Sequence, residues 1–355
     1  MDVFELYADA SKHGELKALI ELGAQEHPTG LAQSFLEKDI WVTEILRLLY
    51  DEKLLGEWDI AFKGGTALSK CWGAIERFSE DIDLSIHWAD LALADDEDAT
   101  WHKTTEKRAQ RDRFRKAQDK LLTAWTTELV ERLNTRLAVY RIEGLRAELE
   151  ADSGGEKVDI HFPRVTANDN AYQLDHVLLE FGGRNRGRPT SPHTIQTYLS
   201  EVPQIAEALA LPIGTVVAYD AGYILWEKLT ALHQFSTQEK TPNFNRLARH
   251  WYDVNCLLQQ EGFAKPLDEE QAMKDVVEMK RLRYSQRGVD YEAVLRGGLQ
   301  LIPDDARLAT IREDHQAAVE GGMFFAEPDP FETIIERLRT SQDTINEALF
   351  DTDES

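Results

Sequence analysis

Cysteine and long apolar runs are both scarce in this sequence of 355 residues. Its two cysteines, Cys71 and Cys256, have no cysteine nearby and no histidine at a zinc-binding spacing, so we expect two reduced packing residues. No apolar run approaches the length of a membrane span, and the N-terminal residues lack the basic and apolar regions of a signal peptide. The sequence therefore predicts a cytoplasmic protein without membrane association.

Positive charge is also in short supply, with 40 Lys and Arg against 64 Asp and Glu and a formal net charge of −24. A field of that sign repels phosphate backbones and argues against a general polyanion-binding protein. The deficit is uneven, because residues 90–98 are acidic whereas residues 103–120 (KTTEKRAQRDRFRKAQDK) carry an excess of Lys and Arg. This basic segment is either a solvated helix face or a local patch for RNA or another anion.

The pattern of apolar residues predicts an α+β fold, and a chain with 42% hydrophobic residues can form one large domain or two modest ones. We expect a helical segment over residues 1–30, a small mixed sheet flanked by helices over residues 31–190, and a helical bundle over residues 191–355. Residues 31–50 have apolar side chains at helical spacing, which predicts a core-facing helix. Residues 104–137 contain no glycine or proline and are predicted to form one long helix, and a further helix is expected to start near Asp220.

Residues 62–86 (FKGGTALSKCWGAIERFSEDIDLSI) have the pattern of a strand, a glycine turn, a helix and a second strand. Gly64 and Gly65 directly precede the helix, which places backbone N–H groups and the positive helix end where a phosphate can bind. Thr66 is positioned to cap the helix and to donate its hydroxyl to a phosphate oxygen. Taken alone, the turn is either an anion-binding cradle or an ordinary strand-to-helix connection.

Two aspartates begin the second strand of this segment. Asp81 and Asp83 share one face of the strand because successive side chains alternate between faces. Carboxylates side by side repel each other, and a divalent cation such as Mg²⁺ removes that cost; the alternative is an exposed strand face on which both acids are solvated. A glycine turn and a metal-binding pair on neighbouring elements together describe a nucleotide site.

The motif KGGTALSK followed by RFSEDIDLSI closely resembles the AbiEii/AbiGii-type nucleotidyltransferase toxin family, a branch of the DNA polymerase beta-like nucleotidyltransferases. Four other segments resemble motifs of the same family in the same order: EKDIWVTEILRLL its lead-in helix, VLLEFGGR its third-acid strand, WEKLTALH its lysine helix, and RLARHWYDV its late aspartate helix. The resemblance covers roughly residues 31–258. It implies a polymerase beta-like core followed by a helical domain.

The resemblance also implies a metal site. Asp81 and Asp83 look like the metal-binding pair, and Glu180 looks like the third carboxylate that completes a Mg²⁺ site for a nucleoside triphosphate (NTP). Glu180 is a candidate general base as well. Without the family, Glu180 is an acid in an apolar strand that needs a partner, and a salt bridge to Arg184 or Arg186 is an alternative to a metal.

Three further residues match the later motifs. Lys228 would hold the phosphates of the nucleotide, although a helix lysine taken alone is normally a surface residue. Asp253 resembles a functional acid of the family, and Arg249, one helical turn before it, is a candidate nucleotide ligand. The alternative is a polar cluster that only anchors its helix by hydrogen bonds.

Arg77 and Ser79, just ahead of the aspartate pair, are placed either to orient the aspartates or to contact phosphate.

The function implied is that of a Mg²⁺-dependent toxin of a toxin–antitoxin system. It would transfer a nucleoside monophosphate from an NTP to an acceptor, for which the resemblance favours the 3′ end of tRNA, and would thereby block translation. A cognate antitoxin would oppose this activity. The basic segment would give RNA an electrostatic foothold, and helices after about Leu267 would shape acceptor choice. Two alternatives remain open: a protein or small-molecule acceptor, and a non-catalytic nucleotide-binding regulator. The foothold residues are Arg108, Arg111, Arg113, Arg115 and Lys116.

Overall fold

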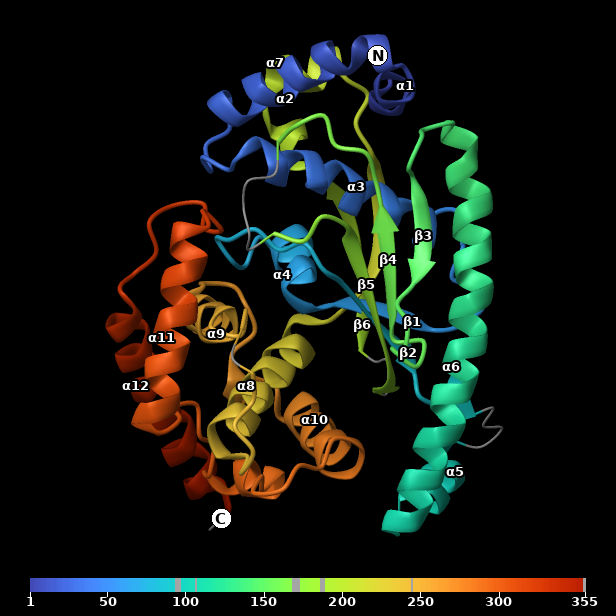
Figure 1. The fold of residues 1–355 in the computed structure, drawn as a ribbon. Helices are drawn as coiled ribbons and strands as arrows, with labels where there is room; N and C mark the ends of the chain where they lie inside the picture. Colours follow the sequence, from blue (N-terminus) through green and yellow to red (C-terminus); the bar gives the residue numbers. More distant parts are fainter. Residues whose placement is uncertain (93–96, 106, 168–172, 186–188, 244, 354–355) are drawn as a thin grey trace. The chain divides into compact units, whose positions relative to one another are not determined.

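The structure, a computed structural model, describes residues 1–92, 97–105, 107–167, 173–185, 189–243 and 245–353 (Figure 1). The chain divides into two compact units. The first contains Met1–Gly73, Arg77–Ala218 and Gly322–Ala326, and the second contains Ala74–Glu76, Tyr219–Gly321 and Glu327–Ser355.

A seven-stranded mixed sheet lies in the first unit, with the strand order β3-β4-β5-β2-β1-β7-β6 (Figure 1). Strands β2 and β5 are parallel, as are β1 and β7, whereas β1–β2, β3–β4 and β4–β5 are antiparallel. The mixed sheet and its helices confirm the expected α+β fold. The strands are β1 (Ile60–Lys63), β2 (Ile82–His87), β3 (Arg146–Leu149), β4 (Lys157–His161), β5 (Val177–Asn185), β6 (Thr190–Gln196) and β7 (Ile213–Tyr219).

The first unit extends beyond the range expected for the core, residues 31–190. Strand β6 has the sequence TSPHTIQ at an edge of the sheet, and its polar composition gives little strand signal. Strand β7 pairs with β1 through Phe62 and Ala218, so the polypeptide returns to the sheet after residue 190. At the N-terminus, the backbone N–H of Ala210 donates to the carbonyl of Met1 at 2.7 Å, which fastens the first residues to the same unit.

Helix α3 is buried on nearly every side. Its predicted apolar positions are all buried in the first unit, because the helix packs between the sheet and the N-terminal helices (Figure 1). The helices of the first unit are α1 (Val3–Ala8), α2 (His13–Glu26), α3 (Gln33–Tyr50), α4 (Gly64–Trp72), α5 (Glu97–Thr105), α6 (Arg108–Leu137) and α7 (Pro203–Ala208). Short 3-10 turns occupy Ala10–Lys12, Asp90–Ala92, Ala138–Tyr140 and Tyr198–Glu201.

The single helix predicted over residues 104–137 is wrong, because α5 ends at Thr105 and α6 begins at Arg108. Lys107 has extended backbone angles, and the side chain of Gln110 accepts its N–H at 2.8 Å, which starts a new helix there. Arg111 donates from Nη1 to the carbonyl of Thr105 at 2.8 Å and so joins the two helices. Helix α6 then runs beside β3, and its N-terminal part reaches past the end of that strand (Figure 1).

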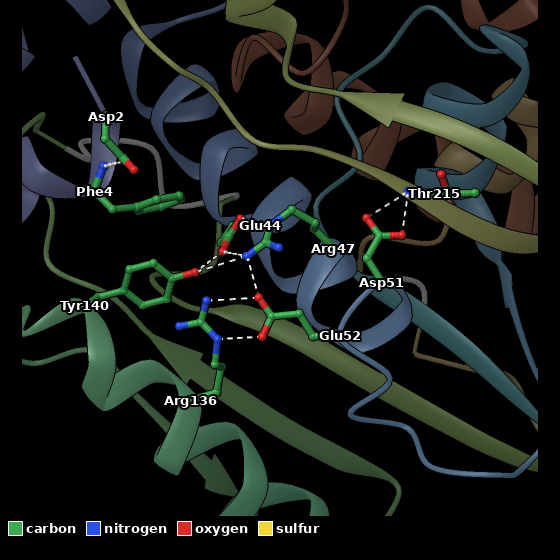
Figure 2. A network of polar contacts seen from close by, with 9 residues as sticks. All are labelled: Asp2, Phe4, Glu44, Arg47, Asp51, Glu52, Arg136, Tyr140 and Thr215. Atoms are coloured by element: carbon green, nitrogen blue, oxygen red, sulfur yellow. Dashed lines mark hydrogen bonds and ion pairs between the residues drawn. The ribbon is translucent and has the colours of Figure 1, made fainter.

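A network of charged side chains fastens α6 to α3 (Figure 2). Arg47 on α3 donates two hydrogen bonds to Glu44, at 2.7 and 2.8 Å, and a third to Glu52 at 3.0 Å. Glu52 also accepts two hydrogen bonds from Arg136 near the end of α6, at 2.5 and 2.9 Å. Glu44 is buried and accepts the hydroxyl of Tyr140. Because forked charge-assisted bonds fix orientation, this end of α6 is held firmly against α3.

The second unit contains the predicted helical bundle. Helix α8 begins directly after Asp220, as expected, and packs against α9 and α10 through apolar residues such as Leu225 and Leu229. The carboxylate of Asp314 accepts the N–H groups of Arg246 and Ala248 at 2.7 Å and so orders the chain before α9. The helices are α8 (Ala221–Thr237), α9 (Arg249–Gln259), α10 (Glu270–Arg283), α11 (Asp305–Glu320) and α12 (Phe331–Asp353), with 3-10 turns at Pro266–Asp268 and Tyr291–Arg296.

Both cysteines are free thiols in partly buried positions, which confirms the prediction of reduced packing residues. Burial raises the pKa of Cys71 to about 12 and that of Cys256 to about 11, so both remain thiols at neutral pH. Within the described ranges, none of the helices combines the length and the apolar character that crossing a membrane requires.

Candidate active site

The sheet brings the glycine turn, the aspartate strand and Glu180 together in the first unit. Strand β1 ends at Lys63 and α4 starts at Gly64, while β2 starts directly after Asp81. The antiparallel register pairs Lys63 with Asp83, and the parallel register pairs Asp83 with Glu180. Residues paired on neighbouring strands point to the same face, so Asp83 and Glu180 are neighbours there.

Gly64 and Gly65 fit tightly against the residues around them. Gly64 has a φ of +76°, and a Cβ at this position would lie 1.9 Å from Oδ2 of Asp83. A Cβ on Gly65 would lie 2.6 Å from Nη2 of Arg77 and 2.7 Å from Oγ of Ser79. A side chain at either position would displace these neighbours, and at Gly64 it would also strain the backbone. The turn lies between a carboxylate and a guanidinium.

Thr66 does not cap the helix, so that expectation is wrong. The helix begins two residues earlier with Lys63 as its N-cap residue, which places Thr66 inside the first turn. The side chain of Thr66 is fully buried, and its hydroxyl donates to the carbonyl of Asp81 at 2.5 Å and lies 3.0 Å from Oγ of Ser79. Thr66 thus fastens the start of the aspartate strand to α4.

Glu180 has a partner that the sequence did not indicate. Lys157 on β4 is paired with Glu180 in the sheet, and its Nζ lies 3.6 Å from Oε1 of Glu180. The side chain of Glu180 is 40% exposed, so this is a partly solvated ion pair. The expected alternatives, Arg184 and Arg186, lie outside the described side chains, as do the acidic residues 95–98.

The carboxylates fit a hard divalent cation by chemistry, since Mg²⁺ prefers oxygen ligands, and the strand register pairs Asp83 with Glu180. Asp81 directly precedes β2 and is 6% exposed. In the described part of the chain, no three His, Cys, Asp or Glu side chains converge closely enough to hold a metal. The carboxylate of Glu180 lies instead beside the ammonium of Lys157.

A fully buried ion pair fixes the residue before Asp81. Nζ of Lys38 on α3 lies 2.7 Å from Oε2 of Glu80, with both side chains inaccessible to solvent, and also donates to the carbonyl of Leu174 at 3.0 Å. Burial lowers the pKa of Lys38, against the opposing effect of Glu80. Because an unpaired buried charge is very costly, this pair holds the start of β2 against α3.

The residues on either side of Lys38 anchor other segments in the same way. Glu37 accepts the backbone N–H groups of Val165 and Thr166 at 2.7 and 3.0 Å. Asp39 lies 2.6 Å from Nζ of Lys70 on α4 and accepts the N–H of Tyr198 at 2.8 Å. The lead-in helix motif EKD is therefore a set of three buried charges that hold three parts of the first unit. Three consecutive charged residues within an apolar helix were the signal in the sequence.

Lys228 and Asp253 lie together in the second unit. Nζ of Lys228 on α8 donates to Oδ2 of Asp253 on α9 at 2.6 Å. Lys228 is 7% exposed and Asp253 is fully buried, so the interpretation of Lys228 as a surface residue is wrong. Arg249 is the first residue of α9, one turn before Asp253. That Lys228 and Arg249 bind a nucleotide remains a prediction.

Comparison with known proteins gives the class and then the family. A family model described as nucleotidyl transferase AbiEii toxin, type IV toxin–antitoxin system, matches residues 47–337. The protein is therefore a nucleotidyltransferase. It belongs to the AbiEii toxin family of type IV toxin–antitoxin systems. The chain is also similar to the solved structure of MenT4, a nucleotidyltransferase toxin from Mycobacterium tuberculosis H37Rv, with 19% identity and a TM-score of 0.48 over 93% of this chain and 98% of that one. A search of curated proteins gave no match.

Replacement of Gly64 by alanine tests whether the turn must approach the carboxylate. Gly64→Ala at the start of α4 and Gly73→Ala at its C-cap both put a side chain at positive φ, but the space around Gly73 is open. Each change costs about 1–2 kcal/mol of backbone strain, and only Gly64→Ala also displaces Asp83. We expect Gly73→Ala to retain pyrophosphate release and Gly64→Ala to lose about tenfold or more. Equal activities would show that the contact with Asp83 is unimportant.

The buried pair predicts a specific stability pattern. Lys38→Met leaves Glu80 buried without its cation, and we expect the free energy of unfolding to fall by about 3–5 kcal/mol. Lys38→Met combined with Glu80→Gln removes both charges and should recover part of that loss. Urea denaturation followed by circular dichroism measures both. A double variant less stable than Lys38→Met would contradict the role of the pair.

Proposed function

We propose that this protein is a Mg²⁺-dependent toxin that transfers a nucleoside monophosphate from an NTP to the 3′ end of tRNA and so blocks translation in the cytoplasm. A cognate antitoxin would oppose it, as the family implies. The observation that carries the proposal is the register that sets Asp83 beside Glu180, with the Gly64 turn packed against Asp83.

The residues have separate roles in this proposal. Backbone N–H groups at Gly64 and Gly65 bind the triphosphate at the positive end of α4, close to the guanidinium of Arg77. Asp81, Asp83 and Glu180 would hold Mg²⁺, which supplies charge neutralisation at the triphosphate and a lowered pKa for the attacking hydroxyl.

Four further charged groups have roles in the proposed mechanism. Glu180 is half-exposed and lies beside Asp83, so its carboxylate can accept the proton of the acceptor hydroxyl. In the second unit, Lys228 neutralises phosphate charge, and Asp253 positions its ammonium through the 2.6 Å contact. Arg249 contributes a further cation to nucleotide binding.

The basic segment supports an RNA acceptor. On α6 the side chains of Arg113, Arg115 and Lys116 are exposed, and the side chain of Arg108 is 89% exposed. Arg111 is only half-exposed and bonds to Thr105, so it contributes to structure rather than to the foothold. These exposed cations near the start of α6 give RNA a region of local attraction on a protein of net charge −24.

Label transfer tests the proposed activity. The protein is incubated with Mg²⁺, total cellular RNA and each α-³²P-labelled ribonucleoside triphosphate in turn, beside Asp83→Asn, which keeps the size of the side chain and removes its charge. We expect label on a tRNA-sized band with the wild type and none with the variant. Labelled protein or small molecules without labelled RNA would contradict the tRNA acceptor. Equal labelling by Asp83→Asn would contradict the assignment of Asp83.

Charge reversal on α6 tests the foothold. The double variant Arg113→Glu with Arg115→Glu should raise the KM for RNA about tenfold at low salt, because fewer counterions are released, and leave the KM for NTP unchanged. The control Lys17→Glu with Arg141→Glu makes the same change in net charge at exposed positions of the first unit. Equal KM values for RNA in the two double variants would show that α6 does not bind the acceptor.

A further inference from the structure

Lysines flank the two paired carboxylates on the sheet. Across the adjacent strands β1, β2, β5 and β4, the register runs from Lys63 to Asp83, then to Glu180, and then to Lys157. Side chains in such a row point to one face, so two neighbouring negative charges lie between two positive ones. Like charges directly opposite each other destabilise a sheet, and the flanking cations offset that repulsion.

Lys157 lies between two carboxylates at nearly equal distances. Its Nζ is 3.6 Å from Oε1 of Glu180 and 3.7 Å from Oε2 of Glu150, the residue that follows β3. The side chain of Lys157 is 39% exposed, so its ammonium can move between the two partners without entering an apolar environment. Glu150 therefore offers Lys157 a partner whenever Glu180 takes another.

We propose that Lys157 is a positioning residue that holds Glu180 away from the metal until a triphosphate is bound. The inference rests on the proposed function, in which Glu180 is a metal ligand. A cation bound by Glu180 would stand within a few ångströms of the Lys157 ammonium, and two positive charges at that separation repel each other. The negative charge of a bound triphosphate would offset that repulsion, and Lys157 would then pair with Glu150 while Glu180 is free to hold the metal.

Substitution of Lys157 and substitution of its alternative partner Glu150 should change the metal affinity in opposite directions. Lys157→Met removes the competing cation, and we expect the nucleotide-free protein to bind Mn²⁺ about fivefold more tightly. Glu150→Gln removes the alternative partner and leaves Lys157 on Glu180, so binding should weaken by about threefold relative to Glu148→Gln. Glu148→Gln is the matched control because it removes the same charge from the same region of the chain, and Glu148 lies beside Arg146 and His161.

Mn²⁺ binding is measured by the paramagnetic resonance signal of the free ion, on the full chain without nucleotide. Lys157→Arg should behave as the wild type, and inorganic tripolyphosphate should reduce the difference between Lys157→Met and the wild type. Unchanged or weaker Mn²⁺ binding by both Lys157→Met and Lys157→Gln would overturn the proposal, as would equal affinities for Glu150→Gln and Glu148→Gln.

Asp83→Asn separates this inference from the proposed function. Mn²⁺ binding that persists in Asp83→Asn would show that the carboxylates do not form the metal site, and both proposals would fall. Binding that is lost in Asp83→Asn but unaffected by Lys157→Met would keep the metal site and remove only the role of Lys157. Because the readout is metal binding, it does not depend on knowing the acceptor.

Discussion

Lys38 and Glu80 bury opposite charges against each other at the start of the aspartate strand, where neither side chain reaches water. Desolvation makes either charge alone prohibitive, so the two must remain together and must bring α3 and β2 with them. The glycine turn is then set by Thr66, which bonds to the carbonyl of Asp81. In the second unit, Lys228 on α8 and Asp253 on α9 form another buried ion pair, which joins these two helices. Paired burial of charge thus orders both sets of predicted site residues.

The sequence pattern predicted those structural features that depend only on residues close together in the chain. The apolar spacing of α3, the strand–glycine–helix–strand order and the start of α8 after Asp220 are all present in the structure. The placement of the turn beside the aspartates followed from the same reasoning, because the two elements are close in sequence. The family resemblance added Glu180, Lys228 and Asp253, which no local rule selects. The family itself is confirmed by the match over residues 47–337.

What the sequence did not indicate depends on contacts between distant residues. Lys157 meets Glu180 only because β4 pairs with β5 in one register, and a shift of one residue would turn it to the other face. Thr66 looked like a cap because its type suits one, but the helix starts earlier. Strand β6 is polar and lies at an edge, so alternation does not mark it. Sequence patterns carry side-chain type and period, and register is set by the whole sheet.

The buried charges on α3 contact residues that come more than 100 positions later in the chain, and this affects folding during synthesis on the ribosome. Glu37 needs backbone groups at Val165 and Thr166, Lys38 needs the carbonyl of Leu174, and Asp39 needs the N–H of Tyr198. Until those residues leave the exit tunnel, α3 cannot bury its charges without large cost. The nascent chain therefore cannot complete the first unit for more than half of its translation, and the enzyme can become active only once most of it has been made.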